Sequence, residues 1–344
     1  MRPFVEQHFY NRRSRKQIGD RYLSYLPEYL EDFKAWYDEN LDSTLDSVSK
    51  QKFRIASTSL NRARWARHIR RGIAGYLRKR GEYPDFLSAK DFGAMNILHS
   101  LLMPMPLTNP ADKLSVGKHI PSSLVQKVGT APVLREWAPD EKLNFDGIEP
   151  GRYFLKANHG SAMNLRLELP CDDSTKAEAQ ALVDKWMATD HGKYSSQWWY
   201  HLIDRRAFIE RDLNDGGIEP LTDFRFHVIN GEPVLLQMDV GLGTNERHNP
   251  VYDSDLNYLP YNFLRRNLHE VPLPEGADTA KELARAIGSK YQYCRVDLYI
   301  TGNQYYLGEL TFLPNAGRRI VQSPELNEYL CGAWNPMPRF VKLS

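Results

Sequence analysis

The sequence is poor in cysteine. Its three cysteines, Cys171, Cys294 and Cys331, are far apart in the chain, and none belongs to a Cys-x-x-Cys pair or a Cys/His cluster. Disulfide-stapled domains and structural zinc sites depend on such patterns. The sequence therefore indicates neither class, and we expect a protein of a reducing compartment.

Long apolar runs and a strong net charge are also missing. No segment approaches the roughly 20 apolar residues that span a bilayer, and the first residues lack the apolar stretch of a signal peptide. The 45 basic and 43 acidic residues leave a net charge of +2, too balanced for binding nucleic acid over the whole surface. We therefore expect a cytoplasmic protein, at most peripheral to the inner face of the membrane, without a nucleic-acid partner.

The length and composition predict a globular α+β protein of several units. A chain of 344 residues exceeds what one hydrophobic core usually serves, and its 42% hydrophobic and 26% charged residues are ordinary globular values. The Pro-rich residues 103–106 mark a boundary, because proline lacks the backbone donor that continues a helix. We expect a helical, basic region over residues 1–108 and two α+β subdomains over residues 109–206 and 207–344.

The N-terminal region has an uneven charge distribution. Residues 52–80 contain basic residues and no acidic ones. Trp65, Ile69, Ile73 and Tyr76 recur at helical spacing, which predicts a basic helix that buries one face and exposes arginines on the other. The exposed face has two interpretations: an ordinary solvated surface, or a binding surface for an anionic polysaccharide or a membrane.

The second half of the chain has the pattern of paired strands. Two turns, Asn230-Gly231 and Gly302-Asn303, lie between apolar or alternating runs, which predicts two antiparallel hairpins. Further patterns predict strands at 153–156 and 207–210, helices at 175–189 and 279–290, and loops over 245–257 and 260–275.

The C-terminal hairpin carries one acidic residue in each strand. Asp297 and Glu309 lie between apolar or small neighbours, where a buried carboxylate is costly unless a cation or hydrogen-bond donors satisfy it. Two converging carboxylates suit Mg²⁺, which favours oxygen ligands and takes the remainder from phosphates and water. The alternative is that strand alternation turns both side chains to the solvent, where they need no partner.

A second polar signal lies earlier in the chain. An apolar strand ends at Lys156 and is followed by a small, polar loop of residues 157–164. Backbone N–H groups near Gly160 and Ser161, together with the charge of Lys156, suit a phosphate group. The Gly-Lys-Ser/Thr pattern of a Walker loop is missing. Alternatively, Lys156 is an exposed strand end and His159 an ordinary loop histidine.

These segments together resemble the ATP-grasp superfamily, in particular its TupA-like branch from cell-surface polymer biosynthesis. The resemblance covers about residues 110 to 320 and lies in the order of "DKLSVGKHI", "YFLKANHGSAMN", "AFIERDL", "DFRFHVINGEPVLLQMD" and "CRVDLYITGNQYYLGELTFLPNAG". It implies an ATP-grasp fold whose two α+β subdomains clasp ATP and Mg²⁺. It also implies a ligase that joins a carboxylate to an amine through an acyl phosphate, with a sugar acid and an amino acid as substrates.

The resemblance implies roles for residues on the nucleotide side. Lys113 and Lys156 match the lysines that hold the phosphates. Glu210 matches the acid that meets the nucleotide, often at its ribose. The loop over the phosphates would bind the cofactor through His159, Gly160 and Ser161.

The resemblance also implies roles near the metal. Asp297 and Glu309 match the two metal-binding carboxylates, and Arg295 matches an arginine that steadies the phosphoryl group. Thr311 occupies the position at which many ATP-grasp ligases carry asparagine as a further metal ligand. We place Thr311 in the metal site by this correspondence, although threonine is a poorer neutral ligand than asparagine. Arg225, on the strand before Asn230-Gly231, is a further candidate for contact with substrate or phosphate.

Two alternatives to a ligase stay open. A kinase on the same fold would use the metal and lysines in the same way but pass the phosphoryl group to a hydroxyl. A non-catalytic protein would bind anionic polymers through the basic residues 52–80 and turn over no nucleotide. The aromatic residues 198–200 suit either stacking on sugar rings or packing in a core.

Overall fold

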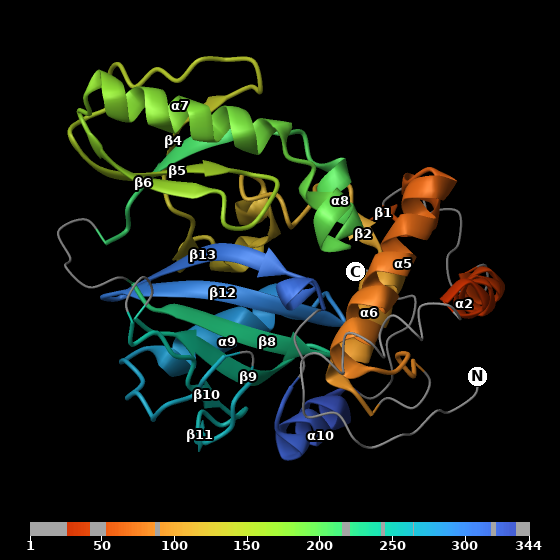
Figure 1. Ribbon diagram of the computed structural model, residues 1–344. Helices are drawn as coiled ribbons and strands as arrows, with labels where there is room; N and C mark the ends of the chain where they lie inside the picture. The colour runs from red at the N-terminus through yellow and green to blue at the C-terminus, as the bar shows by residue number, and fades with distance from the viewer. Residues whose placement is uncertain are drawn as a thin grey trace.

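The computed structural model describes residues 26–41, 53–86, 90–214, 221–241, 245–263, 265–317 and 321–334. Over these ranges the chain forms an α+β molecule with a small sheet above a larger one and helices at one side (Figure 1). The predicted fold class is confirmed. None of the helices in these ranges is both long and apolar enough to cross a membrane.

The larger sheet contains both predicted hairpins. Its strand order is β11-β10-β9-β8-β12-β13-β3, with β8 paired to β9 and β12 paired to β13. Asn230 and Gly231 have φ angles of 51° and 88°, the left-handed conformation that an Asn-Gly hairpin turn requires. The strands are β3 (Val128–Gly129), β8 (Asp223–Ile229), β9 (Glu232–Asp239), β10 (Val251–Tyr252), β11 (Tyr258–Leu259), β12 (Tyr293–Thr301) and β13 (Gln304–Thr311).

The segment predicted as loops over 245–257 and 260–275 contains more structure than expected. Strand β10 pairs with β9, and β11 pairs with β10 at the edge of the sheet. Val251 and Tyr252 are buried at 0% and 1% exposure, so burial of two apolar residues extends the sheet despite the polar composition around them. The rest of the segment is irregular up to helix α9 (Ala277–Gly288).

Strand alternation gives the larger sheet one apolar and one charged face. The apolar face, which includes Phe226, Val228 and Val296, packs against α9. The approach is close, because a Cβ on Gly288 of α9 would lie 2.9 Å from Cβ of Val228. The opposite face carries alternating residues of the central strands, and those nearest the small sheet are charged.

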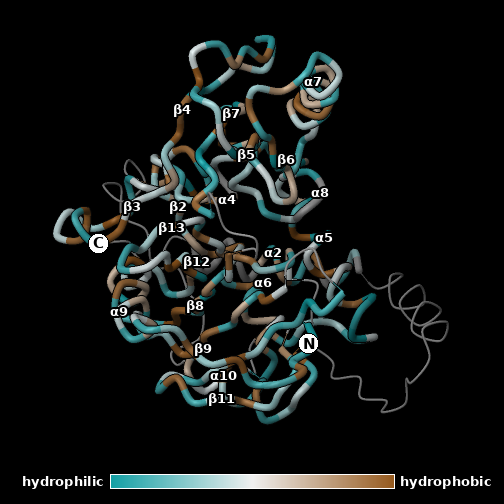
Figure 2. Tube along the Cα trace, turned by 90° about the vertical axis from the view of Figure 1, so that its left-hand side faces the viewer, coloured by the Kyte–Doolittle hydropathy of each residue, from teal (hydrophilic) through white to brown (hydrophobic). Residues whose placement is uncertain are grey.

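The small sheet has four strands in the order β4-β7-β5-β6 and is covered on one face by α7 (Figures 1 and 2). Helix α7 contributes Val183 and Trp186 to a core with Leu155 and Ile209. The bounds are β4 (Val133–Trp137), β5 (Gly151–Ala157), β6 (Asn164–Leu169), β7 (Ala207–Arg211) and α7 (Asp173–Ala188).

One strand crosses a predicted boundary. Strand β7 begins at residue 207, which we assigned to the C-terminal unit, but it pairs with β4 and β5 of the small sheet. Ala207 and Ile209 are 0% exposed there and complete the core beneath α7. The division of the chain into three units stays a prediction.

The basic helix is shorter than the predicted range 52–80. Helix α5 (Arg62–Arg80) buries Trp65, Ile69, Ile73 and Tyr76, as the spacing predicted. Before it come β1 (Phe53–Arg54) and α4 (Ala56–Ser59). Residue 52 and the part of the expected helical region before residue 26 lie outside the described residues. The remaining elements are α2 (Leu26–Leu41), α6 (Phe92–Leu102), β2 (Met105–Pro106), η2 (Val116–His119), η3 (Ser122–Leu124), α8 (His191–Ser195), η4 (Trp198–Leu202), η5 (Pro314–Gly317) and α10 (Pro324–Ala333).

Helix α6 is buried along its whole length and covers part of the charged sheet face with a histidine. His99 packs on Tyr293 and Trp334, with ring centroids 5.9 and 5.6 Å away. Among the residues described, neither ring nitrogen of His99 has a hydrogen-bond partner. Burial lowers the pKa of His99 from 6.5 to about 3, so the folded state holds this ring neutral.

Acid should therefore destabilise the protein through His99. The unfolded state takes up a proton as the pH falls below about 6.5, whereas the folded state does so only near 3, so stability is lost as the pH falls. Between about pH 7 and 5 this single group should remove about 2 kcal/mol. Urea unfolding at both values should show that His99→Leu loses less stability on acidification than the unchanged protein. Parallel losses would contradict the assignment.

Candidate functional site

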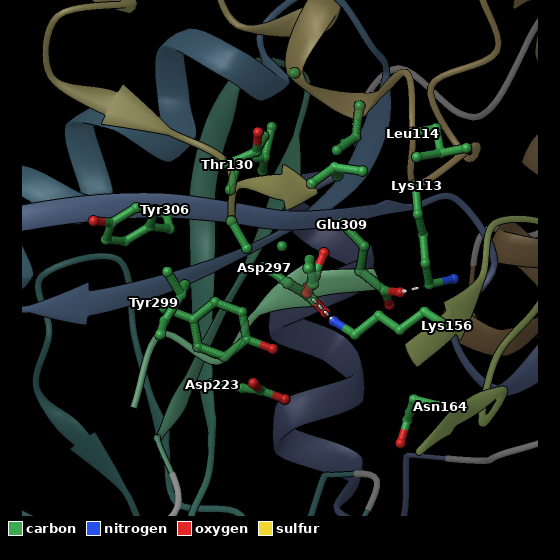
Figure 3. Close-up of a pocket in the computed structure, with 18 of the residues that line it drawn as sticks. Lys113, Leu114, Thr130, Lys156, Asn164, Asp223, Asp297, Tyr299, Tyr306 and Glu309 are labelled. Carbon is green, nitrogen blue, oxygen red and sulfur yellow. Dashed lines mark hydrogen bonds and ion pairs between the residues drawn. The ribbon is translucent and has the colours of Figure 1, made fainter. Parts of the chain in front are cut away.

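A cleft of about 360 Å³ lies between the small and the large sheet. Lys156 and Asn164 reach it from the small sheet, and Asp297 and Glu309 reach it from β12 and β13 (Figure 3). Lys113 enters from the segment before η2. The cleft thus joins the two polar signals of the sequence, which are more than a hundred residues apart.

The register of the larger sheet explains why the carboxylates meet here. Asp297 of β12 lies directly beside Glu309 of β13 on one side and Arg225 of β8 on the other. Alternation places Arg225 and Asp297 on the charged face, which the small sheet covers, and a β-bulge between Asp297 and Leu298 brings Glu309 to the same face. Asp297 is 5% exposed, and the side chain of Glu309 is 35% exposed. The alternative that alternation turns both carboxylates to bulk solvent is therefore wrong.

Arg295 holds the two carboxylates together. Its guanidinium binds Asp297 through two parallel hydrogen bonds, Nε to Oδ1 at 2.6 Å and Nη2 to Oδ2 at 2.5 Å. Nη2 also donates to Oε1 of Glu309 at 3.0 Å and to Oγ1 of Thr311 at 3.1 Å. A planar guanidinium can make such forked contacts, and a single ammonium group cannot. Arg295 therefore holds Asp297 and Glu309 in a fixed orientation relative to each other.

The two carboxylates differ in their affinity for a proton. Burial raises the pKa of Asp297 to about 7, although the charge of Arg295 opposes the shift. Burial also acts on Glu309, but the charges of Lys113 and Arg295 outweigh it and lower the pKa of Glu309 to about 2. Glu309 is thus firmly ionised, while Asp297 is the carboxylate whose charged form would gain most from a further cation.

Two lysines, Lys113 and Lys156, lie between the small sheet and the carboxylates of Asp297 and Glu309. Lys113 Nζ donates a hydrogen bond to the carbonyl of Gly160 and lies 3.9 Å from Oε2 of Glu309. Lys156 of β5 forms an ion pair with Glu210 of β7, whose direct cross-strand partner is Phe154. Burial lowers the pKa of Lys113. Two ammonium groups therefore face the carboxylates across the cleft.

Part of the loop predicted to hold phosphate lies at the cleft. Ser161 lines the cleft, and the Gly160 carbonyl accepts from Lys113. Gly160 has no room for a side chain, since a Cβ there would lie 2.8 Å from Sδ of Met163 and 3.1 Å from the ring of His191. The close packing of this loop therefore depends on glycine.

Two of the predicted site residues do not offer their polar atoms to the cleft. His159 is 1% exposed, and its Nε2 lies 3.1 Å from the Trp186 carbonyl, because a helix leaves its last carbonyls in need of donors. The prediction that His159 contacts a cofactor does not fit this position. The hydroxyl of Thr311 donates to Glu309 at 2.8 Å and accepts from Arg295. Thr311 thus supports Glu309 rather than presenting a free ligand oxygen.

Other residues of the cleft were missed or left undecided. Asp223 and Tyr299 line it and lie two positions from Arg225 and Asp297 on the same strands, so period-2 alternation was a usable signal for both. The stacking alternative for residues 198–200 fails at Trp198 and Trp199, because both are buried, at 0% and 1% exposure.

The residues of the cleft fit a magnesium-bound nucleoside triphosphate. Within the described part of the chain, no group of three or more His, Cys, Asp or Glu side chains could hold a metal by itself. Two carboxylates suffice for Mg²⁺, which commonly borrows phosphate and water oxygens. Asp297 and Glu309 would supply the carboxylate oxygens. Lys113, Lys156 and the backbone at Ser161 suit the phosphates.

Comparisons with solved structures find several ATP-grasp enzymes. D-alanine–D-alanine ligase from Bacillus anthracis in complex with ATP is 15% identical, with a TM-score of 0.37, over 64% of this chain and 56% of that one. ATP-grasp ligase PsnB with its minimal precursor is 12% identical, with a TM-score of 0.35, over 65% and 59%. D-cycloserine synthetase DcsG is 12% identical, with a TM-score of 0.37, over 66% and 72%. The chain thus spans less than two thirds of the first two proteins.

No curated protein sequence matches the chain. A family profile does, and the matched residues 96–333 include the small and the large sheet, the cleft and part of helix α6. The matched region is more than half of the chain and contains every site residue named above. The chain therefore belongs to the TupA-like ATP-grasp family.

Proposed function

We propose that the protein is an ATP-dependent carboxylate–amine ligase of cell-surface polysaccharide biosynthesis. The observation that supports it most is the cleft in which Lys113 and Lys156 face Asp297 and Glu309 across two sheets. Membership of an ATP-grasp family agrees with this chemistry. The polysaccharide context has only the family resemblance in its favour.

Each side chain has a task that follows from its charge and position. ATP with Mg²⁺ supplies the phosphoryl group that converts the carboxylate into an acyl phosphate. Lys113 and Lys156 offset the repulsion between anionic reactants. Arg295 keeps Asp297 and Glu309 oriented toward the metal position. The loop at Gly160 and Ser161 would exclude water from the acyl phosphate.

The product of the reaction tests this function directly. The protein would be incubated with ATP, Mg²⁺ and paired panels of uronic acids, amino acids and amines, and the products would be analysed by mass spectrometry. A ligase forms ADP, free phosphate and an amide. ADP with a stable phosphorylated product would instead identify a kinase. Absence of ATP turnover across the panels would contradict both and leave the binding protein as the remaining interpretation.

We also propose that the exposed face of α5 binds a linear anionic polymer. Arg64, Arg67 and Arg78 fall within about 60° of one another around the helix axis and span about 21 Å along it. Arg64, Arg67 and Arg78 are exposed. In the described ranges, no exposed large hydrophobic residue lies on α5. A helix that enters a membrane surface needs such residues, so charge alone favours a polymer.

Binding to polygalacturonate, a polymer of uronic acids, should weaken when this stripe loses charge. We expect the double change Arg64→Gln and Arg67→Gln to reduce affinity about tenfold at low salt, because exposed charge pairs contribute modestly and are screened. Fluorescence anisotropy with labelled polymer at increasing NaCl would measure it. The matched control changes Lys127 and Lys185, which are exposed elsewhere. Equal losses in both variants, or stronger binding to anionic vesicles or DNA, would contradict the proposal.

A further inference from the structure

Charge is divided unequally along the cleft. The lysines and the phosphate-suited loop lie at one side, where Figure 3 shows Lys113 and Lys156 beside Glu309. Asp223 and Tyr299 lie at the other side, with the Tyr299 hydroxyl directed at Asp223. Asp223 also forms an ion pair with Arg225 of the same strand. The far side of the cleft thus carries an aspartate that is paired with one arginine and has a tyrosine hydroxyl beside it.

The position of Asp223 is fixed by the sheet. It is the first residue of β8 and pairs with Asp239 of β9 in the antiparallel register. It shares the charged face with Arg225, two residues further along the same strand, at a strand spacing of about 7 Å. Its side chain is 13% exposed, whereas that of Asp239 is fully buried. Asp223 is therefore the one of this pair that is open to the cleft.

The negative charges of Asp239 and Asp297 are compensated by more arginine contacts than the charge of Asp223 is. Asp239 receives two hydrogen bonds from Arg247, at 2.8 and 2.5 Å, and one ion pair from Arg225 at 2.8 Å. Asp297 receives the forked contact from Arg295. Arg225 also forms an ion pair with Asp223 and lies 3.8 Å from Asp297.

One guanidinium is thus shared among three carboxylates. An ionised carboxylate can accept about four hydrogen bonds. Asp223 accepts a hydrogen bond from Arg225, and the hydroxyl of Tyr299 points toward it (Figure 3). These two contacts leave room at the Asp223 oxygens for a donor that arrives through the cleft.

We propose that Asp223, oriented by Tyr299, binds the acceptor amine as its ammonium ion beside the acyl-activating site. The proposal rests on the ligase function above. An ammonium group offers three donors and a positive charge, which matches the free acceptor positions of the carboxylate. The Asp297–Arg225 pairing across β12 and β8 places this subsite next to the metal-binding carboxylates. Lys113 and Lys156, at the opposite side, would repel the same cation and so fix its orientation in the cleft.

The test compares a charged with a neutral nucleophile. With the carboxylate and amine found by the product screen, Asp223→Asn should raise the KM of the amine about 30-fold near pH 7, since loss of one partner of a partly buried charge pair is costly. The KM ratio between variant and unchanged protein should shrink as the pH rises through the pKa of the amine. Hydroxylamine, which is neutral near pH 7 and traps acyl phosphates as hydroxamates, should show a KM change below about threefold.

Two further variants separate this role from a structural one. Tyr299→Phe keeps the anion and removes its orienting hydroxyl, so we expect a smaller increase in the KM of the amine, about fivefold. Asp255→Asn, in an exposed loop, is the matched control for loss of one negative charge. Thermal unfolding would be recorded for all three.

The possible outcomes are distinct. A selective effect on the ammonium substrate supports the subsite. An equal loss with hydroxylamine, a KM ratio that does not change with pH, or no effect at all would overturn it while leaving the ligase assignment intact. If the unchanged protein forms neither amide nor hydroxamate with any carboxylate, the ligase function itself has failed, and the subsite fails with it.

Discussion

Glu309→Gln is expected to reduce ATP turnover about a thousandfold, because it removes the firmly ionised carboxylate at which metal and phosphate charge would be balanced. Glu309 is the residue on which Lys113, Arg295 and Thr311 converge, at 3.9, 3.0 and 2.8 Å. Glutamine keeps an oxygen that can accept from Thr311, and it is close in size. The change therefore tests charge rather than shape.

The measurement is ATP turnover as a function of Mg²⁺ concentration. If Glu309 is a metal ligand, the variant should need more Mg²⁺ and still stay far below the unchanged protein at saturation. Glu232→Gln is a suitable control, since Glu232 lies on β9, is 66% exposed and pairs with Arg285 away from the cleft. Turnover within about threefold of the unchanged protein at ordinary Mg²⁺ would contradict the assigned role, because a lost metal ligand should cost much more.

The sequence was sufficient to predict the two hairpins, but not every pair of residues that meets across them. Turn chemistry at Asn230-Gly231 and Gly302-Asn303 fixed two antiparallel pairs. The register next to the second turn pairs Leu298 with Leu307 and, continued, would place Asp297 opposite Gly308. A β-bulge between Asp297 and Leu298 shifts this register, so that Asp297 pairs with Glu309 instead. Local patterns do not reveal what covers a sheet face. From the alternation alone, the charged face of the larger sheet could have faced either solvent or a cleft. The packing of the small sheet against this face makes it one wall of a cleft.

Two candidate site residues have polar atoms that contact other protein groups. His159 was assigned from its place in a polar loop, but its ring turns toward the carbonyl end of α7. Thr311 was assigned by alignment with a ligand position, but its hydroxyl is used by Glu309 and Arg295. In both cases the strand or loop was right, and the partner came from an element distant in sequence or from across the hairpin. Asp223 was also missed, although alternation from Arg225 along β8 places it on the same face.

The second large effect is expected at Arg295, whose contribution depends on the shape of its side chain as well as its charge. The residue is 7% exposed and reaches Asp297, Glu309 and Thr311 with one planar group. Arg295→Lys keeps the positive charge but replaces the fork by a single point donor, which cannot bind both oxygens of Asp297 and reach Glu309. The two carboxylates should then lose their common orientation.

We expect Arg295→Lys to lower turnover about a hundredfold and the free energy of unfolding by about 2 kcal/mol, since it disrupts a buried charge network without removing the charge. Steady-state ATP turnover and urea unfolding of the same preparation would measure both. Arg285→Lys is the matched control, because Arg285 forms ion pairs with two exposed glutamates on the surface. Should Arg295→Lys behave like this control in both assays, the forked contact would be dispensable, and the carboxylates would have to be positioned by the strands alone.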